Sequence, residues 1–313
     1  MTARVKKTGK TRIFKSKWDW IFYIGLLIIP LTQVAIFYFA VNINSIFLAF
    51  KEYDGASGTF VWSLGAIKEL FTALGSDNAM ITRFVNSLIM YAVSIVIIVP
   101  LSLMFSFYIY KKRPASRFFR TMLFLPSVVS PIVLTMLFGY FVDRAVPEIM
   151  MNWFHKEVPG LLSGLETQFS TVIIYNVFLG FGVQILMYAN AMSGINDSAV
   201  EAARLEGASS MQEFWHISLP SIWSTLVTFV VVGVAGLFTN QLNLIGFFGT
   251  SANTESQSIG YWLAAEILKA SGTQGGVARY PLLSAMGLLL TVIAVPLTFL
   301  VKFLMERFGP RTE

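Results

Sequence analysis

Six long apolar runs constrain the fold of this chain more than any other feature. Each is close to the roughly 20 residues that an α-helix needs to cross about 30 Å of hydrocarbon. None of the 23 Lys and Arg residues or the 17 Asp and Glu residues falls inside a run. We therefore predict an all-α, multi-pass membrane protein with six transmembrane helices. The predicted spans are 20–41, 86–110, 121–142, 171–191, 221–244 and 284–301.

Composition excludes several other classes of protein. Charged residues make up 13% of the chain, against about 25% in a typical soluble domain. There is no cysteine, and the two histidines, His155 and His216, are far apart in sequence, which argues against a metal site. No G-x-x-x-x-G-K-[ST] or G-x-S-x-G motif occurs, so neither a phosphate-binding loop nor a nucleophile elbow is expected. The net charge of +6 could suit nucleic acid, but its placement indicates a membrane surface instead.

The basic residues predict the orientation of the spans. Residues 1–19 hold seven cations, and the short link 111–120 holds five cations and no acid. The three links on the opposite side hold three, two and two cations. The positive-inside rule therefore places both termini in the cytoplasm. The link 192–220 follows on the same side, although it has one cation and four acids. The first run is too long for a signal peptide and is expected to remain as a helix.

Residues 198–220 form a polar island that predicts two short helices. Ser198 and Glu201, and then Ser210 and Glu213, have the spacing of a capping box. Gly207 lies between them, where a left-handed residue would end the first helix. Pro220 could begin the helix that follows.

Seven residues of this island stand in a fixed order: EAA, three residues, G, nine residues, I, one residue, LP. They are Glu201, Ala202, Ala203, Gly207, Ile217, Leu219 and Pro220. The pattern resembles the EAA loop of binding-protein-dependent ABC import permeases, with Glu206 where that family often has Asp. The resemblance implies a type I importer permease domain at 20–305. That domain has an EAA coupling loop at 192–220, and cytoplasmic tails at 1–19 and 306–313 flank it.

The resemblance also implies partners. They are a second homologous permease, two ATP-binding subunits, an extracytoplasmic substrate-binding protein and the lipid bilayer; nucleic acid is not expected. ATP and Mg would be bound by the ATPase subunits, so this chain would be a transport subunit with no cofactor and no enzyme activity. The EAA loop would dock in a cleft of an ATPase subunit, with large apolar side chains inserted there. The predicted coupling residues are the seven above together with Glu206, Met211, Phe214 and Trp215.

Uncharged polar side chains within the spans mark a candidate substrate site. Matching by distance from the EAA motif to maltose-type permeases implies two substrate-facing sets, and each has the i, i+3, i+4, i+7 spacing of one helix face. The sets are Asn176, Leu179, Gly180 and Val183, and Gly233, Gly236, Leu237 and Asn240. The amides could equally hold helices together, and both interpretations stay open at this point.

The absence of charge in the spans bears on the substrate. Ion-coupled carriers need carboxylates or His within the membrane, whereas Asn, Gln and Tyr suit neutral, hydroxyl-rich molecules. We therefore expect a carbohydrate, most simply an oligosaccharide, taken up across the cell membrane. The alternatives are an ABC permease for a glycerophosphodiester or polyamine, or an ATP-independent carrier or channel. Short helices are also expected in the outer loops, near 67–74 and 261–269.

Overall fold

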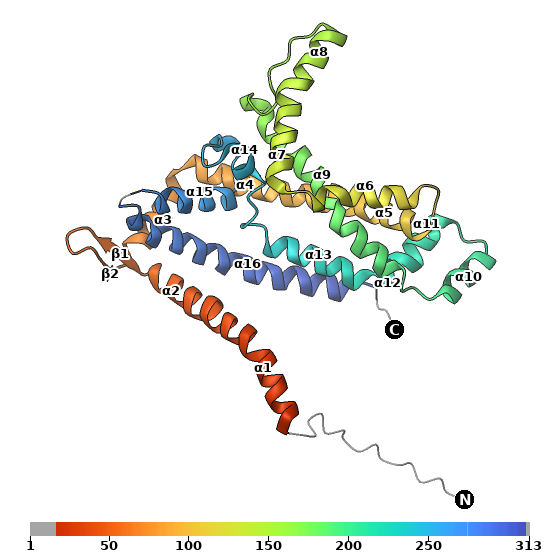
Figure 1. The fold of residues 1–313 in the computed structure, drawn as a ribbon, viewed down its shortest axis with the longest axis horizontal. Coiled ribbons are helices and arrows are strands. Elements are labelled where there is room, and N and C mark those ends of the chain that lie inside the picture. Colours follow the sequence, from red (N-terminus) through yellow and green to blue (C-terminus); the bar gives the residue numbers. More distant parts are fainter. Residues whose placement is uncertain (1–16, 274, 311–313) are drawn as a thin grey trace, which may run out of the picture.

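The computed structural model describes residues 17–273 and 275–310, and it is almost entirely helical (Figure 1). Most of the predicted N-terminal tail (1–16) and the last three residues of the predicted C-terminal tail lie outside the described residues. The first half of the chain contains α1 (Lys17–Gln33), the π-helical η1 (Val34–Ala40), α2 (Val41–Leu48), β1 (Lys51–Asp54), β2 (Thr59–Trp62), α3 (Gly65–Ser76), α4 (Asn78–Val93), the π-helical η2 (Ser94–Ile98), α5 (Val99–Tyr110), α6 (Ser116–Val128), α7 (Pro131–Tyr140), the π-helical η3 (Phe141–Ala145) and α8 (Val146–Phe154). The second half contains α9 (Leu165–Met192), α10 (Asp197–Leu205), α11 (Ser210–Glu213), the π-helical η4 (Phe214–Ser218), α12 (Leu219–Ser221), α13 (Trp223–Ala235), α14 (Leu244–Phe248), the 3₁₀ turn η5 (Thr254–Ser256), α15 (Ile259–Ser271), the 3₁₀ turn η6 (Gly276–Arg279) and α16 (Tyr280–Phe308).

Four of the predicted spans are continuous helices long and apolar enough to cross a membrane. They are longer than predicted and cover Trp20–Leu48, Asn78–Tyr110, Leu165–Met192 and Gly276–Phe308. The other two apolar runs are bent. Ser116–Val128 meets Pro131–Phe154 at 101°, and Ser210–Ser221 meets Trp223–Ala235 at 69°. The described chain therefore has four such helices, or six spans if each bent pair counts as one.

Proline explains the first bend. Pro131 disfavours helical geometry in the residue before it, and Ser130 has an extended ψ of 127°. Beyond the bend, α7 and α8 project from the rest of the helices as an arm (Figure 1). The chain returns along this arm, where Asp143 accepts hydrogen bonds from the Leu162 N–H at 2.7 Å and the Ser163 hydroxyl at 2.9 Å. The third apolar run is thus not one straight helix.

The long helices share two ends, which we name by what lies there. At the hairpin end are β1, β2, α3 and α15; at the island end are α10, α11 and α12 (Figure 1). The antiparallel β1–β2 pair, with Lys51 opposite Trp62, is a small departure from an all-α fold. Helices α3 and α15 confirm the two short loop helices expected from the sequence, and Leu70 of α3 is buried.

The first helical span stands apart from this body. Figure 1 shows α1 diverging from α13 and α16. No side chain of its apolar window is buried within the chain, although residues such as Leu26, Ile29 and Phe37 are large and apolar. Such a surface requires lipid or another membrane protein around it.

Helix α13 is shorter than the run that predicted it. The run extends to Leu244, but the helix ends at Ala235, and residues 236–243 form turns with left-handed backbone at Leu242 and Asn243. Thr and Asn are weak helix formers, and three such residues, Thr239, Asn240 and Asn243, lie in this stretch. Irregular backbone at membrane depth is tolerated only where protein satisfies its polar groups. This segment, which we call the α13 break, therefore needs specific partners.

The loop beyond the α13 break supplies several of these partners. Ser258 donates a hydrogen bond to the Asn240 carbonyl at 2.6 Å. Gly260, at the start of α15, lies so close that a Cβ there would be 2.6 Å from the Thr239 carbonyl carbon. Asn86 of α4 in turn donates to the carbonyls of Glu255 and Gln257 at 2.7 and 2.9 Å. The loop is thus wedged between α4 and the break.

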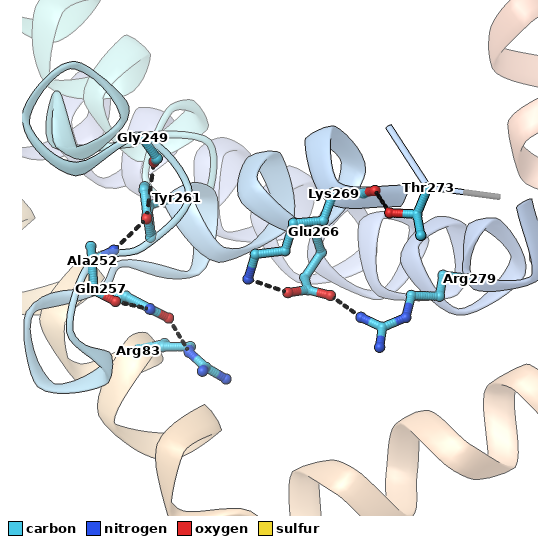
Figure 2. Close-up of polar contacts among 9 residues, drawn as sticks. All are labelled: Arg83, Gly249, Ala252, Gln257, Tyr261, Glu266, Lys269, Thr273 and Arg279. Carbon is cyan, nitrogen blue, oxygen red and sulfur yellow. Dashed lines mark hydrogen bonds and ion pairs between the residues drawn. The ribbon is translucent and has the colours of Figure 1, made fainter. Parts of the chain in front are cut away.

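Figure 2 shows how the same loop is fastened to its surroundings. The Tyr261 hydroxyl donates to the Gly249 carbonyl at 3.1 Å and accepts from the Ala252 N–H at 2.9 Å. Burial raises the pKa of Tyr261, which keeps this donor protonated. Arg83 of α4 donates to the Gln257 side chain at 2.9 Å. Further along α15, Glu266 accepts from Lys269 at 3.0 Å and from Arg279. The loop is a folded cap on the hairpin end.

Changing Gly260 to Ala tests this close approach. The added Cβ would clash with backbone of the α13 break, so we expect Gly260→Ala to destabilise the folded chain by about 1–3 kcal/mol. The measurement is the thermal unfolding midpoint of the purified protein in detergent. Gly287→Ala in α16 is the matched control, because its Cβ would meet nothing within 4 Å. Equal midpoints for the two variants would show that the contact has no energetic weight.

Candidate translocation cavity and coupling surface

A cavity of about 200 Å³ lies beside the α13 break, near the middle of the long helices. It gathers residues from three separate parts of the chain. Its lining is Ser87, Met90, Tyr91, Ser94, Ile98, Asn176, Gly180, Gln184, Gly233, Gly236, Leu237 and Asn240. Every lining residue is uncharged, and half are polar or aromatic-polar. The cavity is therefore suited to neutral hydrogen-bonding groups.

Six of the eight residues predicted for a substrate site line this cavity. They are Asn176, Gly180, Gly233, Gly236, Leu237 and Asn240. Leu179 and Val183 do not line it, and Val183 is half exposed. The expectation that 233–240 forms one helical face is wrong, because the helix ends at Ala235. Turns, rather than helical periodicity, bring Leu237 and Asn240 to the same wall.

Asn176 proves to hold the α13 break in place. Its side-chain nitrogen donates to the carbonyls of Val172 and Leu242 at 2.8 and 3.0 Å. Its side-chain oxygen accepts from the Asn243 amide at 2.9 Å. The interpretation of this amide as a link between helical segments is thus favoured over direct substrate contact.

Gln184 and Asn240 are the amides with capacity left for a ligand. The Oε1 atom of Gln184 is buried and has no hydrogen-bond partner among the described residues. Asn240 is exposed, and its oxygen accepts from the Leu242 N–H at 2.9 Å. A buried acceptor without a partner costs free energy, so a donor is expected to reach Gln184 in the working state.

The wall formed by α4 and η2 was missed by sequence reasoning. Tyr91, Ser94 and Ile98 contribute to it, and a Cβ on Gly180 would lie 2.8 Å from the Ile98 side chain. A Cβ on Gly233 would likewise lie 3.2 Å from the Tyr91 ring. Serines and a tyrosine in an apolar run do not by themselves indicate a binding site. The sequence feature that could have indicated this wall is the pair Gly180 and Gly233, because small residues allow close packing.

At the island end, the EAA loop forms the two predicted helices, α10 and α11–α12, with different caps. Asn196, not Ser198, caps α10 by accepting from the Ser198 N–H at 3.1 Å. Ser209, not Ser210, caps α11 in a capping box with Gln212. Asn is as good a cap as Ser, and each helix begins one or two residues earlier than the Glu-based pattern indicated. Gly207 has a φ of +83°, which confirms the left-handed end of α10.

The predicted coupling residues divide into exposed and buried groups. Leu205, Met211 and Trp215 are 89%, 64% and 57% exposed, so they form an apolar surface at this end of the molecule. Leu205 was not among the predicted residues. Phe214 is buried, contrary to its expected insertion in a partner, and its ring packs against Phe107 of α5 at 5.2 Å. The remaining predicted positions are Glu201, Ala202, Glu206 and Gly207, which are exposed, and Ala203, Ile217, Leu219 and Pro220, which are half-buried.

A buried ion pair anchors the loop to the end of the second span. Lys111, which ends α5, binds both carboxylate oxygens of Glu213, and the two side chains are 8% and 3% exposed. The Lys111 ammonium also lies 5.6 and 5.7 Å from the ring centres of Phe107 and Tyr110. Arg204 of α10 approaches the same carboxylate at 4.0 Å. Glu213 thus joins α5, α10 and α11, a role that its position in the sequence did not reveal.

Removing one partner of this pair would leave a buried charge uncompensated. We expect Lys111→Met to destabilise the folded chain by about 3–5 kcal/mol and to open 192–220 to proteolysis. The double variant Lys111→Met/Glu213→Leu should recover most of that loss. Lys302→Met, which breaks an exposed pair with Glu306, is the control. Parental stability and protease resistance in Lys111→Met would contradict the anchoring role.

Comparison with known proteins bears on these features. The permease protein MG188 homolog of Mycoplasma pneumoniae is 27% identical over 54% of this chain, and the match spans about half of that relative (52%). The polygalacturonan/rhamnogalacturonan transport system permease protein YteP of Bacillus subtilis is 21% identical over 92% of this chain and 88% of its own length. One solved structure is similar in fold, with a TM-score of 0.76, 19% identity and coverage of 93% and 96% of the two chains. It is a chain of a bacterial alginate ABC transporter in complex with an alginate pentasaccharide-bound periplasmic protein.

A family description also matches most of the chain. Residues 98–313 match the family "Binding-protein-dependent transport system inner membrane component". The match covers the cavity walls after η2, the EAA loop and the last two apolar runs. The chain therefore belongs to this family of multi-pass inner membrane components of binding-protein-dependent transport systems.

Proposed function

We propose that this chain is one of two permease subunits of an ABC importer that takes up a carbohydrate, an oligosaccharide in the simplest case. In this proposal it has six spans, with both termini and the EAA loop in the cytoplasm. The observation that carries the proposal is the uncharged, amide-lined cavity joined through α9 to the EAA loop. Relatives named for polysaccharide transport support the same substrate class.

The size of the cavity supports a shared path. At about 200 Å³ it is smaller than the roughly 300–1,000 Å³ of most ligand pockets. A second homologous permease would supply the opposite wall, and it would also cover apolar surface such as that of α1 and α2. An extracytoplasmic binding protein would deliver substrate to the hairpin end. Two ATP-binding subunits would hold ATP and Mg at the island end, so this chain would carry no cofactor and catalyse no reaction.

The lining of the cavity weighs against the alternatives. A polyamine would call for carboxylates and a glycerophosphodiester for Lys or Arg, and neither lines the cavity. An ion-coupled carrier would likewise need an ionisable group there. The same absence favours neutral sugar units at this wall. Uptake of labelled short oligosaccharides by cells with and without the ATPase subunits tests the proposal, and uptake that persists without them would refute it.

Gln184 is the side chain on which substrate recognition should depend most directly. Gln184→Leu keeps the size of the side chain but removes the acceptor, so transport should fall about fivefold to tenfold while complex assembly stays intact. Val183→Ala, one residue away but outside the cavity, should transport at the parental rate. A deficit in Val183→Ala with normal transport in Gln184→Leu would place the substrate outside this cavity, against Val183.

Gly207 should be required for coupling because of its backbone conformation alone. A Cβ there would meet nothing within 4 Å, so steric contact is not the issue. A β-branched residue resists a φ of +83°, whereas Asn tolerates it. We expect Gly207→Val to lose substrate-stimulated ATP hydrolysis by the assembled complex and Gly207→Asn to keep most of it. Full coupling in Gly207→Val would show that the geometry of the loop is not used for transmission.

A further inference from the structure

A second cavity, of about 610 Å³, lies at the island end between the ends of α5, α6 and α9. Three cationic residues line it: Lys112, Arg117 and Arg120. The polar residues Ser116, Asn190 and Ser193 complete its hydrogen-bonding groups. This cavity is separate from the uncharged one beside the α13 break, and the proposed function gives it no role.

The positive charge of this cavity is not neutralised by any of the described residues. The segment 111–120 contains five cations and no acid. Lys111 is bound to Glu213, and Arg113 donates to the Ser210 hydroxyl at 3.1 Å. The three lining cations form no ion pair with any described residue, and all three are exposed.

The start of α6 adds to this field. Its cap residue, Ala115, is left-handed with a φ of +57° and offers no side-chain hydrogen bond. In α6, a helix of 13 residues, the Ser116 N–H donates to the Arg113 carbonyl at 3.0 Å, but the next N–H groups have no side-chain cap among the described residues, and the positive end of the helix dipole faces the same region. Cations, hydroxyls and open N–H groups together are the set that binds a phosphate.

The surroundings indicate a lipid as the source of that phosphate. Phe118, Met122 and Leu125 follow one another at i, i+4 and i+7 along α6, and they are 57%, 45% and 49% exposed. This apolar ridge begins at Phe118, next to Arg117 of the cavity lining, and continues along α6. A headgroup phosphate in the cavity would leave the acyl chains beside the ridge.

We propose that this cavity binds the phosphate of an anionic phospholipid from the leaflet at the island end. Basic pockets between transmembrane helices are a physically favourable site for such headgroups. Lys111 and Arg113 of the same segment hold Glu213 and Ser210 of the EAA loop, so a bound lipid would also order the anchor of that loop. The inference rests on the membrane placement of the proposed function but not on its substrate.

Native mass spectrometry of the purified chain tests this site. The chain is titrated with phosphatidylglycerol and, separately, with phosphatidylcholine of the same acyl chains. We expect retained phosphatidylglycerol, and at least tenfold weaker binding in Arg117→Gln/Arg120→Gln, since this variant removes two of the three lining charges. The double variant Lys68→Gln/Lys156→Gln removes the same charge elsewhere and should bind like the parent.

Two competition arms separate the lipid from a soluble anion. Inorganic phosphate and glycerol phosphate are added at millimolar concentration, and neither should displace the lipid. Displacement by either, equal retention of both lipids, or parental binding in Arg117→Gln/Arg120→Gln would overturn the proposal. Lipid binding is measured on the purified chain, so its outcome does not depend on sugar uptake. If the chain binds the lipid but cells take up the oligosaccharides without the ATPase subunits, only the proposed function is refuted.

Discussion

The architecture depends on satisfying the irregular backbone that follows α13. The helix stops at Ala235, and the segment beyond it has carbonyl and N–H groups that no helical ladder pairs. Asn176 supplies a donor to the Leu242 carbonyl, Ser258 supplies one to the Asn240 carbonyl, and Gly260 permits the approach of α15. The uncharged cavity exists because the break is held open in this way. Fold stability and the candidate translocation path therefore depend on the same few contacts.

A second constraint operates at the island end. The Lys111–Glu213 pair is buried beside aromatic rings, where an unmatched charge would be costly. It ties the EAA loop to α5, while Phe214 packs on the same helix. Leu205, Met211 and Trp215 are left outside as an apolar surface. The segment α11–η4 thus turns Glu213 and Phe214 inward against α5 while Met211 and Trp215 stay exposed.

The sequence predicted the local features well where one physical rule dominated. Long runs without charge identified the membrane helices, and Gly207 identified the left-handed end of α10, since few residues other than glycine accept that conformation. The caps were misplaced by one or two residues because Asn196 and Ser209 satisfy the same N–H groups as the predicted Ser residues. The fifth span was predicted too long. Hydropathy does not distinguish an apolar helix from apolar turns whose backbone groups are hydrogen-bonded by neighbouring segments.

By itself, the sequence determined that the chain is a helical membrane protein and that residues 198–220 carry the EAA pattern, because hydropathy and motif spacing are local properties. Only the tertiary structure decided which polar groups meet. In the structure, Asn176 binds the α13 break, and the Gln184 Oε1 atom has no hydrogen-bond partner among the described residues. Glu213 pairs with Lys111, 102 residues away. The structure also separates Leu179 and Val183 from the cavity that the other six predicted residues line. These outcomes depend on where helices bend and stop, and the free energy that sets those points comes from contacts between distant segments.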